Sequence, residues 1–295
     1  MRTLGPMVLQ LVALGLMLAA CSPTSSATTA LPGTTSLFLE GTGEAGEATS
    51  GVGQERTPPG ATQEATAAAP VPTPAPPPAP SEVDIPGASG LILRGTYYGP
   101  SAAPAPAVLL LHMYGGTKQD WQGLALRLQA SGLACLAIDL RGHGQTGGEE
   151  DWEQAREDVR LAYAWLVSRQ EVRADRSAVV GASIGANLAL WLGAQEPGVA
   201  AIALLSPGFE YFRVRIEGLI EDYGARPIFL AASEDDTYSA DTVRQLAQAA
   251  TGPVELALYP SAGHGTDMLV GAPDLADRLE AFLGQYLASS SPEQP

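Results

Sequence analysis

The sequence predicts an α/β fold in which a mostly parallel central sheet carries helices on both faces. From about Ser81 onward, short apolar runs alternate with amphipathic helical stretches. This alternation is typical of parallel sheets whose strands are joined by helical crossovers. Most of the runs are apolar at every position, as expected for strands that are buried on both faces. We assign residues 81–290 to this domain, because about 210 residues are enough for one sizeable core.

The expected elements follow one another along the chain. Strands are predicted at 91–98, 107–111, 133–138, 178–181, 199–205, 227–232 and 254–259. Helices are predicted at 120–131, 151–170, 184–195, 240–250 and 274–287. In the second helix, Val159, Ala162, Tyr163, Leu166 and Val167 fall on one face, which is the spacing of a helix that packs against a core.

The N-terminus has a different character. One charge, Arg2, precedes an apolar run over 7–20 that only Gln10 interrupts. This run is shorter than the roughly 20 residues that span a bilayer, and it fits the core of a secretory signal. Leu18-Ala19-Ala20-Cys21 resembles the lipobox of bacterial lipoproteins. That resemblance implies removal of 1–20, lipidation of Cys21 and an exported protein anchored to the outer face of a membrane, either plasma or outer. An ordinary signal peptide is the alternative.

Residues 21–80 are rich in Thr, Ala, Gly and Pro, and end in a proline run over 70–80. Such a segment buries too little apolar surface to offset its conformational entropy, so we expect a disordered tether. A segment recognised by a proline-binding domain is the alternative. Residues 291–295 are expected to form a disordered tail. Cys135 lies within an apolar run and is expected to be a buried free thiol.

Charge and motif content exclude several functions. The net charge is −16, so the chain lacks the basic surface that nucleic acids or anionic lipids require. Its three histidines are dispersed, without an H-E-x-x-H motif or cysteine pairs, and this predicts no metal site. No phosphate-binding loop and no G-x-G-x-x-G after a strand are present, so no cofactor is expected.

The stretch Gly181-Ala182-Ser183-Ile184-Gly185 lies between a predicted strand and a predicted helix. A serine at such a point is typical of a nucleophile elbow, a sharp turn that lifts the hydroxyl out of the sheet. Side chains two positions before and after the serine would collide, and both positions are glycine. The Ile184 amide would then face a developing oxyanion. Alternatively, Ser183 is an ordinary helix cap.

Polar loops follow four other predicted strands, at the sheet edge where ligands bind in this fold class. They contain His112-Met113-Tyr114-Gly115-Gly116, Asp139-Leu140-Arg141-Gly142-His143-Gly144, Ser233-Glu234-Asp235-Asp236 and Gly263-His264-Gly265. Serine, acid and histidine therefore occur in that order along the chain. His112 and His143 are expected to brace loops.

Together these motifs resemble the α/β-hydrolase fold, in its dienelactone-hydrolase-like and small serine esterase branch. The resemblance implies Ser183 as nucleophile and His264 as general base. It implies Asp236 as the acid that orients the base, with Asp235 and then Glu234 as alternatives. The second oxyanion donor is expected to be the Tyr114 amide, although Met113 replaces a glycine that is frequent in the family.

The substrate is inferred from the short segment 206–226, where the family inserts its lids. This segment has room for one helix, near 214–223, but not for a large cap. We therefore expect an open site for a small-molecule ester with a short acyl chain. Phe209, Tyr211 and Phe212 are candidates to line its acyl side, with packing in the core as the alternative. A catalytically inactive fold that serves as a surface binding module remains an alternative, as do a thioesterase and a peptidase.

Overall fold

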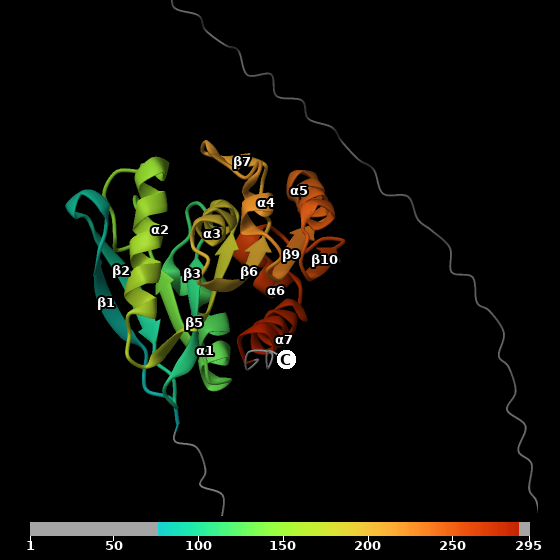
Figure 1. The fold of residues 1–295 in the computed structure, drawn as a ribbon. Coiled ribbons are helices and arrows are strands. Elements are labelled where there is room, and N and C mark those ends of the chain that lie inside the picture. Colours follow the sequence, from blue (N-terminus) through green and yellow to red (C-terminus); the bar gives the residue numbers. More distant parts are fainter. Residues whose placement is uncertain (1–75, 289–295) are drawn as a thin grey trace, which may run out of the picture. The chain divides into compact units, whose positions relative to one another are not determined.

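The computed structural model describes residues 76–288. Within them, one eight-stranded sheet has the strand order β1-β2-β4-β3-β5-β6-β9-β10 (Figure 1). β2 pairs antiparallel with β1 and β4, and the other neighbours are parallel. The strands are Ser81–Pro86 (β1), Ile92–Tyr98 (β2), Ala105–Leu111 (β3), Ala134–Ile138 (β4), Val172–Ala182 (β5), Val199–Leu205 (β6), Ile228–Ser233 (β9) and Val254–Tyr259 (β10). The predicted mostly parallel sheet is confirmed.

Helices cover both faces of this sheet, as predicted. They are α1 (Gln122–Ala130), α2 (Trp152–Val167), α3 (Ile184–Gln195), α5 (Thr237–Ala249) and α7 (Leu275–Ala288). Alternate residues of β3 point to opposite faces: Leu109 belongs to the core shared with α2, α3 and α5, and Leu110 belongs to the core shared with α1 and α7. Because both faces are buried, the strands must be apolar at consecutive positions.

Side-chain caps set where two of the helices begin. The Asp151 carboxylate accepts hydrogen bonds from the amides of Glu153 and Gln154, each at 3.1 Å, and α2 starts at the next residue. Asp236 caps α5 in the same way by accepting from the Ser239 amide. This helix therefore starts at Thr237, three residues before the predicted start.

Other differences from the sequence-based expectations have physical causes. β1 was not predicted, because Ile85 is its single buried residue and an exposed edge strand needs no apolar run. β5 begins at Val172 rather than 178, since its first half is polar and reaches beyond the buried part of the sheet. The predicted helix at 120–131 divides into a 3-10 turn, Lys118–Trp121, and α1.

The segment between β6 and β9 holds two short elements in place of one helix near 214–223. A hairpin pairs β7 (Glu210–Tyr211) with β8 (Val214–Arg215), and α4 spans Leu219–Tyr223. The two turn residues are Phe212 and Arg213, with φ of 49° and 68°. Both central residues of a tight hairpin turn of this type have positive φ, which favours glycine or asparagine.

A buried amide fixes this hairpin to the body of the domain. Asn187, in the first turns of α3, donates to the carbonyls of Gly208 and Val214, each at 2.9 Å, and accepts from the Gly208 amide. These bonds hold the chain just before β7 and within β8. The hairpin therefore keeps a fixed position over the start of α3, and in Figure 1 it projects toward α2, whose first residue, Trp152, contacts the hairpin tip.

Several sequence-based expectations lie outside the described residues. They are the signal peptide at 1–20, lipidation of Cys21, the tether as far as residue 75 and the tail at 291–295. At the end of the expected tether, the Pro78 carbonyl accepts a hydrogen bond from Gln129 at 2.9 Å, so the chain contacts the domain before residue 81. Among the described helices, none has the length and apolarity needed to cross a membrane.

Candidate active site

Ser183 occupies a strained turn between β5 and α3. Its φ of 54° and ψ of −119° lie in a region that non-glycine residues rarely adopt. Strain of this kind costs on the order of 1–3 kcal/mol and persists only where neighbouring structure enforces it. The Ser183 amide donates to the Leu205 carbonyl of β6 at 2.8 Å, which fixes the turn to the adjacent strand.

The two flanking glycines make this turn possible. A Cβ atom on Gly181 would lie 2.1 Å from the Gly185 carbonyl oxygen, across the turn. A Cβ atom on Gly185 would lie 2.4 Å from the Leu111 carbonyl oxygen, at the end of β3. Backbone atoms cannot move aside as side-chain ends can, so any larger residue at either position would displace Ser183.

Ser183, His264 and Asp236 form a continuous hydrogen-bonded relay. His264 Nε2 lies 2.8 Å from Ser183 Oγ, and His264 Nδ1 lies 2.6 Å from Asp236 Oδ2. The hydroxyl donates to Nε2 when Nδ1 carries the proton and donates it to the carboxylate. The structure thus brings together three residues that lie up to 81 positions apart in the chain.

Asp236 is held as a carboxylate. Burial on its own would raise the pKa of Asp236, but hydrogen bonds from Ser239 and His264 outweigh burial and lower that pKa below its ordinary value. The Ser239 hydroxyl is fully buried and lies 3.2 Å from Tyr211 Oη. Sequence reasoning missed Ser239, although the spacing of Asp236 and Ser239 in a helix-capping pattern could have identified it.

The two competing acids have other partners. Asp235 Oδ2 accepts from Ser261 Oγ at 2.6 Å, and Glu234 forms an ion pair with Arg244 at 2.9 Å. Both carboxylates are on the exposed side of the loop. Only Asp236, among these three acids, reaches His264.

Buried hydroxyls at the ends of neighbouring strands hold the His264 loop. Ser206, at the end of β6, accepts from the Gly265 amide at 3.0 Å. Ser233, at the end of β9, donates to the Gly263 carbonyl at 2.7 Å and accepts from the Ala262 amide. Both glycines have positive φ, so the loop can turn tightly on each side of the histidine. Sequence reasoning did not identify either serine.

Two backbone amides were expected to face an oxyanion, those of Ile184 and Tyr114. Ile184 is the first residue of α3, where amides have no partner within the helix. Tyr114 occupies a turn whose internal hydrogen bond joins the Gly116 amide to the Met113 carbonyl at 3.0 Å. That bond leaves the Tyr114 amide outside the pairing of the turn. The Met113 sulfur packs where a Cβ atom on Gly265 would lie, so this loop borders the His264 loop.

The remaining two histidines brace the loops around the site. His112 is buried, its Nε2 accepts from the Leu140 amide at 2.9 Å, and its Nδ1 donates to the Met113 carbonyl at 2.7 Å. Burial lowers the pKa of His112 to about 4, although the bond to Met113 partly opposes this effect. His143 Nδ1 bonds the carbonyl of Arg141 at 2.9 Å.

Asp139 is buried and bound to the single lysine of the chain. Its carboxylate accepts from the Lys118 amide at 2.8 Å and from Lys118 Nζ at 3.3 Å, and from the Gln145 amide at 2.7 Å. A Cβ atom on Gly144 would collide with this carboxyl group at 2.3 Å. Asp139 is therefore enclosed by the loop that it organises, and it is not available to a ligand.

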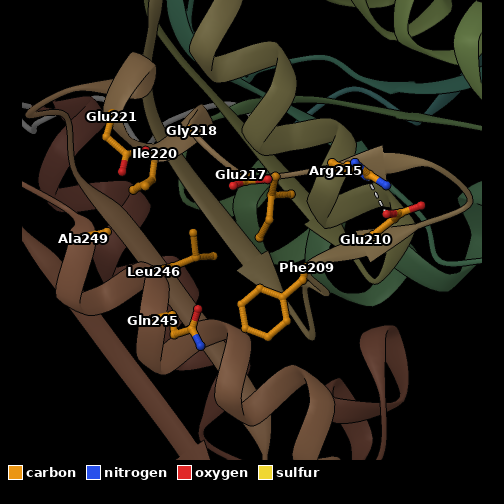
Figure 2. A pocket seen from close by; sticks show the side chains of 11 residues that line it. Phe209, Glu210, Arg215, Glu217, Gly218, Ile220, Glu221, Gln245, Leu246 and Ala249 are labelled. Carbon is orange, nitrogen blue, oxygen red and sulfur yellow. Dashed lines mark hydrogen bonds and ion pairs between the residues drawn. The ribbon is translucent and has the colours of Figure 1, made fainter.

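The three aromatic residues proposed to line the acyl site diverge. The Tyr211 ring lies edge-on to His264, with centroids 6.2 Å apart. Phe212 lies 4.8 Å from the Tyr114 ring. Phe209 instead lines a cavity of about 520 Å³ between the hairpin, α4 and α5, together with Ile216, Ile220 and Leu246 (Figure 2). No member of the Ser183 relay lines that cavity.

In the described part of the chain, no group of three or more His, Cys, Asp or Glu residues could hold a metal ion.

The chemistry that the Ser183–His264–Asp236 relay can support is that of an activated hydroxyl. It offers a serine paired with a histidine, a carboxylate behind the histidine, and the amide of Ile184 next to the serine.

Several known proteins are similar to this chain in sequence. Residues 102–221 match the model of the serine aminopeptidase family S33. An uncharacterised protein of Mycobacterium tuberculosis is 29% identical over 213 residues, which cover 66% of this chain and 75% of that protein. A monoacylglycerol lipase of Mycolicibacterium smegmatis is 29% identical over 130 residues, covering 43% of this chain and 46% of the lipase.

Solved structures share the fold at lower sequence identity. An α/β hydrolase from a Penicillium species has a TM-score of 0.61 and 18% identity, covering 72% of this chain and all of that one. A dienelactone hydrolase from Anabaena variabilis has a TM-score of 0.57 and 22% identity, covering 70% and 99%. An esterase from Pyrococcus furiosus has a TM-score of 0.59 and 20% identity, covering 71% and 91%.

Proposed function

We propose that this chain, which has the α/β-hydrolase fold, is a serine hydrolase that cleaves short-chain carboxylic esters through an acyl-enzyme intermediate. The observation that carries the proposal is the Ser183–His264–Asp236 relay, with hydrogen-bond distances of 2.8 and 2.6 Å and a strained backbone at the serine. A serine used only as a helix cap needs neither a histidine partner nor that backbone conformation.

The reaction follows from this arrangement. Ser183 Oγ attacks the ester carbonyl carbon while its proton passes to His264 Nε2. The negative charge on the former carbonyl oxygen is stabilised by the amides of Ile184 and Tyr114. When the tetrahedral intermediate collapses, the bond to the alcohol oxygen breaks, and His264 gives the alcohol its proton. Water, activated by the same histidine, then releases the carboxylic acid and restores the hydroxyl.

Asp236 and its surroundings support the cationic stage of His264. Because the carboxylate stays ionised, it stabilises the imidazolium that forms in each half-reaction. Ser239, in α5, forms a hydrogen bond with Asp236, and Tyr211, in the hairpin, places its ring beside His264. The hydroxyls of Ser239 and Tyr211 lie 3.2 Å apart. Burial raises the pKa of Tyr211, so its phenol keeps its proton at neutral pH and can serve as a donor.

A small-molecule ester with a short acyl chain suits the segment above the site. Between β6 and β9, the chain forms a two-residue-turn hairpin and the five-residue helix α4, which leave the serine without a large cover. The side chain of His264 is 40% exposed, so solvent reaches the relay although Ser183 itself is buried. An open site of this kind encloses little of a long acyl chain.

Labelling with a fluorophosphonate probe tests the nucleophile. We expect the wild-type chain to be labelled and Ser183→Ala to remain unlabelled. Equal thermal stability of the two proteins shows that the variant is folded. A series of 4-nitrophenyl esters, from acetate to octanoate, tests the substrate class. We expect kcat/KM to be highest for the short chains. Labelling that persists in Ser183→Ala, or the absence of labelling and turnover in folded wild type, would favour a catalytically inactive binding module.

A peptidase is the second candidate, and the match of 102–221 to the serine aminopeptidase family S33 favours it. The relay would cleave an amide by the same steps. Alanine 4-nitroanilide, compared with 4-nitrophenyl acetate, distinguishes the two. We expect ester cleavage, and nitroanilide turnover with a higher kcat/KM would replace the esterase proposal. A thioesterase is tested in the same way with an acetyl thioester.

We further propose that the chain is exported and anchored to the outer face of a membrane by a lipid on Cys21. The support is the sequence alone: the apolar run at 7–20 and the Leu18-Ala19-Ala20-Cys21 motif. In cells that express the full chain, we expect Cys21→Ala to move the protein into the soluble fraction and to abolish lipid labelling. Lipid labelling that persists in this variant would contradict the anchor.

A further inference from the structure

Four aromatic rings from three separate segments of the chain contact one another around Tyr114. Tyr114 follows β3, and Phe212 is at the tip of the β7–β8 hairpin. His143 lies between β4 and α2, and Trp152 is the first residue of α2. Trp152 and Phe212 stack with centroids 5.0 Å apart and planes 18° apart. Tyr114 lies 4.8 Å from Phe212 and 5.4 Å from His143, and His143 lies 5.8 Å from Trp152. We call these four side chains the aromatic platform.

Much of the aromatic platform faces solvent. Tyr114 is 50% exposed and Phe212 is 45% exposed, so large apolar surfaces remain uncovered. Trp152 and Phe212 also form the apolar wall of a cavity of about 400 Å³, together with Val214. Core packing alone does not explain these exposed rings, because an exposed ring does not contribute the favourable free energy of burying apolar surface.

Phe212 is kept at this place against a backbone preference. Its φ of 49° lies in the left-handed region, where asparagine or glycine would be more favourable. The following residue, Arg213, has the same kind of conformation, with φ of 68°. A hairpin tip built from two such residues is strained, and strain of this kind clusters at sites that clamp ligands.

Strand order places the aromatic platform and His264 on opposite sides of the serine. Ser183 follows β5, and the sheet order is β4-β3-β5-β6-β9-β10. Tyr114, His143 and Trp152 follow β3 and β4, on one side of β5. His264 and Asp236 follow β10 and β9, on the other side.

The hairpin spans this division with consecutive residues. Tyr211 has its ring 6.2 Å from His264, whereas Phe212 has its ring 4.8 Å from Tyr114. Tyr211 is the last residue of β7, and Phe212 is the first turn residue, where the positive φ changes the direction of the chain, so one hairpin contributes to both sides. The hairpin thus contributes one ring beside the base and one ring to the aromatic platform.

This division assigns the two halves of the substrate. The leaving alcohol must receive its proton from His264, so the alcohol lies on the His264 side. The carbonyl oxygen points toward the amides of Tyr114 and Ile184. The remaining substituent of the carbonyl carbon, the acyl group, points away from His264, and the aromatic platform is a partly exposed apolar surface on that side.

We propose that the aromatic platform of Tyr114, His143, Trp152 and Phe212 binds an aromatic ring carried by the acyl group, so that the preferred substrates are esters of short aryl-alkanoic acids. This inference rests on the proposed ester hydrolysis at Ser183. A planar ring fits among the rings of the platform in stacked and edge-to-face contacts at centroid distances of about 4.5–7 Å. A saturated ring of similar size loses those contacts.

The test compares two esters that share one alcohol, 4-nitrophenyl 3-phenylpropanoate and 4-nitrophenyl 3-cyclohexylpropanoate. We expect the wild type to favour the aryl ester in kcat/KM about tenfold. Phe212→Asn removes the ring but suits the positive φ, so the turn is preserved. We expect this variant to lower the preference to near one, and Phe212→Tyr to retain it.

Phe209→Ala is the matched control, because Phe209 immediately precedes the same hairpin but lines the other cavity (Figure 2). We expect its aryl preference to equal that of the wild type. A wild type without aryl preference would overturn the inference. The inference would also be overturned if Phe212→Asn slowed both esters equally. The same holds if Phe209→Ala removed the aryl preference as fully as Phe212→Asn does.

Two further measurements separate this inference from other outcomes. Benzyl acetate and cyclohexylmethyl acetate carry the ring on the alcohol, and a preference lost there in Phe212→Asn would overturn the acyl assignment. Binding of ethyl 3-phenylpropanoate to Ser183→Ala, followed by ligand-observed NMR, does not require turnover. If that ester binds more tightly than its cyclohexyl analogue while no ester is hydrolysed by the wild type, the aromatic platform stands and the proposed hydrolysis fails.

Discussion

The two sides of Ser183 each carry an aspartate after a strand and a histidine in a glycine-rich turn. On one side, Asp236 bonds His264 at 2.6 Å, and both side chains remain partly exposed. On the other side, Asp139 bonds Lys118 and is fully buried, and its neighbour His143 bonds a backbone carbonyl instead. Similar residues in similar loops therefore differ in role because of their partners and their access to solvent.

This difference has a physical basis in what each carboxylate must balance. Asp139 is compensated by a buried lysine and by two backbone amides, so its charge serves the folded state. Asp236 is compensated by a histidine that can gain and lose a proton, so its charge is available to stabilise a transient cation. Replacing both aspartates in the same way tests the comparison directly.

The largest effect is expected for Asp236→Asn. This change keeps the shape of the side chain but removes the charge that orients and stabilises protonated His264. We expect kcat for a short ester to fall roughly 10⁴-fold, with the free energy of unfolding changed by less than about 1 kcal/mol. Steady-state kinetics and urea unfolding measure the two quantities. A fall in kcat of less than tenfold would exclude Asp236 as the acid and return Asp235 to consideration.

Asp139→Asn is expected to have the opposite profile. It removes the buried carboxylate beside the Lys118 ammonium, which then has Glu82, at 3.2 Å, as its remaining carboxylate partner. We therefore expect a loss of about 3 kcal/mol, the lower end of the cost of breaking a buried pair. The midpoint of urea unfolding should therefore shift strongly, while kcat per folded molecule stays within about tenfold of the wild type. If stability is unchanged and kcat falls by several orders of magnitude, the two sides have been assigned the wrong way round.

The buried His112 predicts a dependence of stability on pH. Burial lowers the pKa of folded His112 from 6.5 to about 4, so between these values the unfolded state binds more protons. The free energy of unfolding should therefore fall as the pH is lowered from 6.5 to 4, by about 3 kcal/mol at most. Above pH 6.5 the contribution of neutral His112 to this free energy should be complete. His112→Asn should flatten this part of the curve, as followed by urea unfolding at each pH. An equally steep curve in that variant would assign the dependence to other groups.

The smallest expected effect concerns the hydrogen bond behind Asp236. Ser239→Ala removes a donor to the carboxylate, whose lowered pKa depends partly on that bond. We expect kcat/KM to fall about fivefold, corresponding to about 1 kcal/mol. Ser261→Ala removes a comparable hydroxyl from Asp235 and serves as the control, with kcat/KM unchanged. Equal effects of the two variants would show that Ser239 has no special link to the relay.

The sequence determined the fold class and the main elements for a clear reason. Strands buried on both faces must be apolar at consecutive positions, and amphipathic helices must repeat their apolar residues at helical spacing. The helix at Ile184–Gln195 and the strands at Val199–Leu205 and Val254–Tyr259 match their predicted bounds. The edge strand β1 and the β7–β8 hairpin were not predicted, because short or exposed elements lack those patterns.

Local rules in the sequence also determined the shape of the Ser183 turn, because the collisions that its two glycines avoid involve backbone atoms at short range or at the adjacent strand. Tertiary structure alone decided which acid meets His264, that Ser206 and Ser233 hold its loop, and that Phe212 joins rings from two other segments. These contacts join residues far apart in the chain. Their distances depend on how strands are ordered and loops packed, and no local pattern of residue types specifies that arrangement.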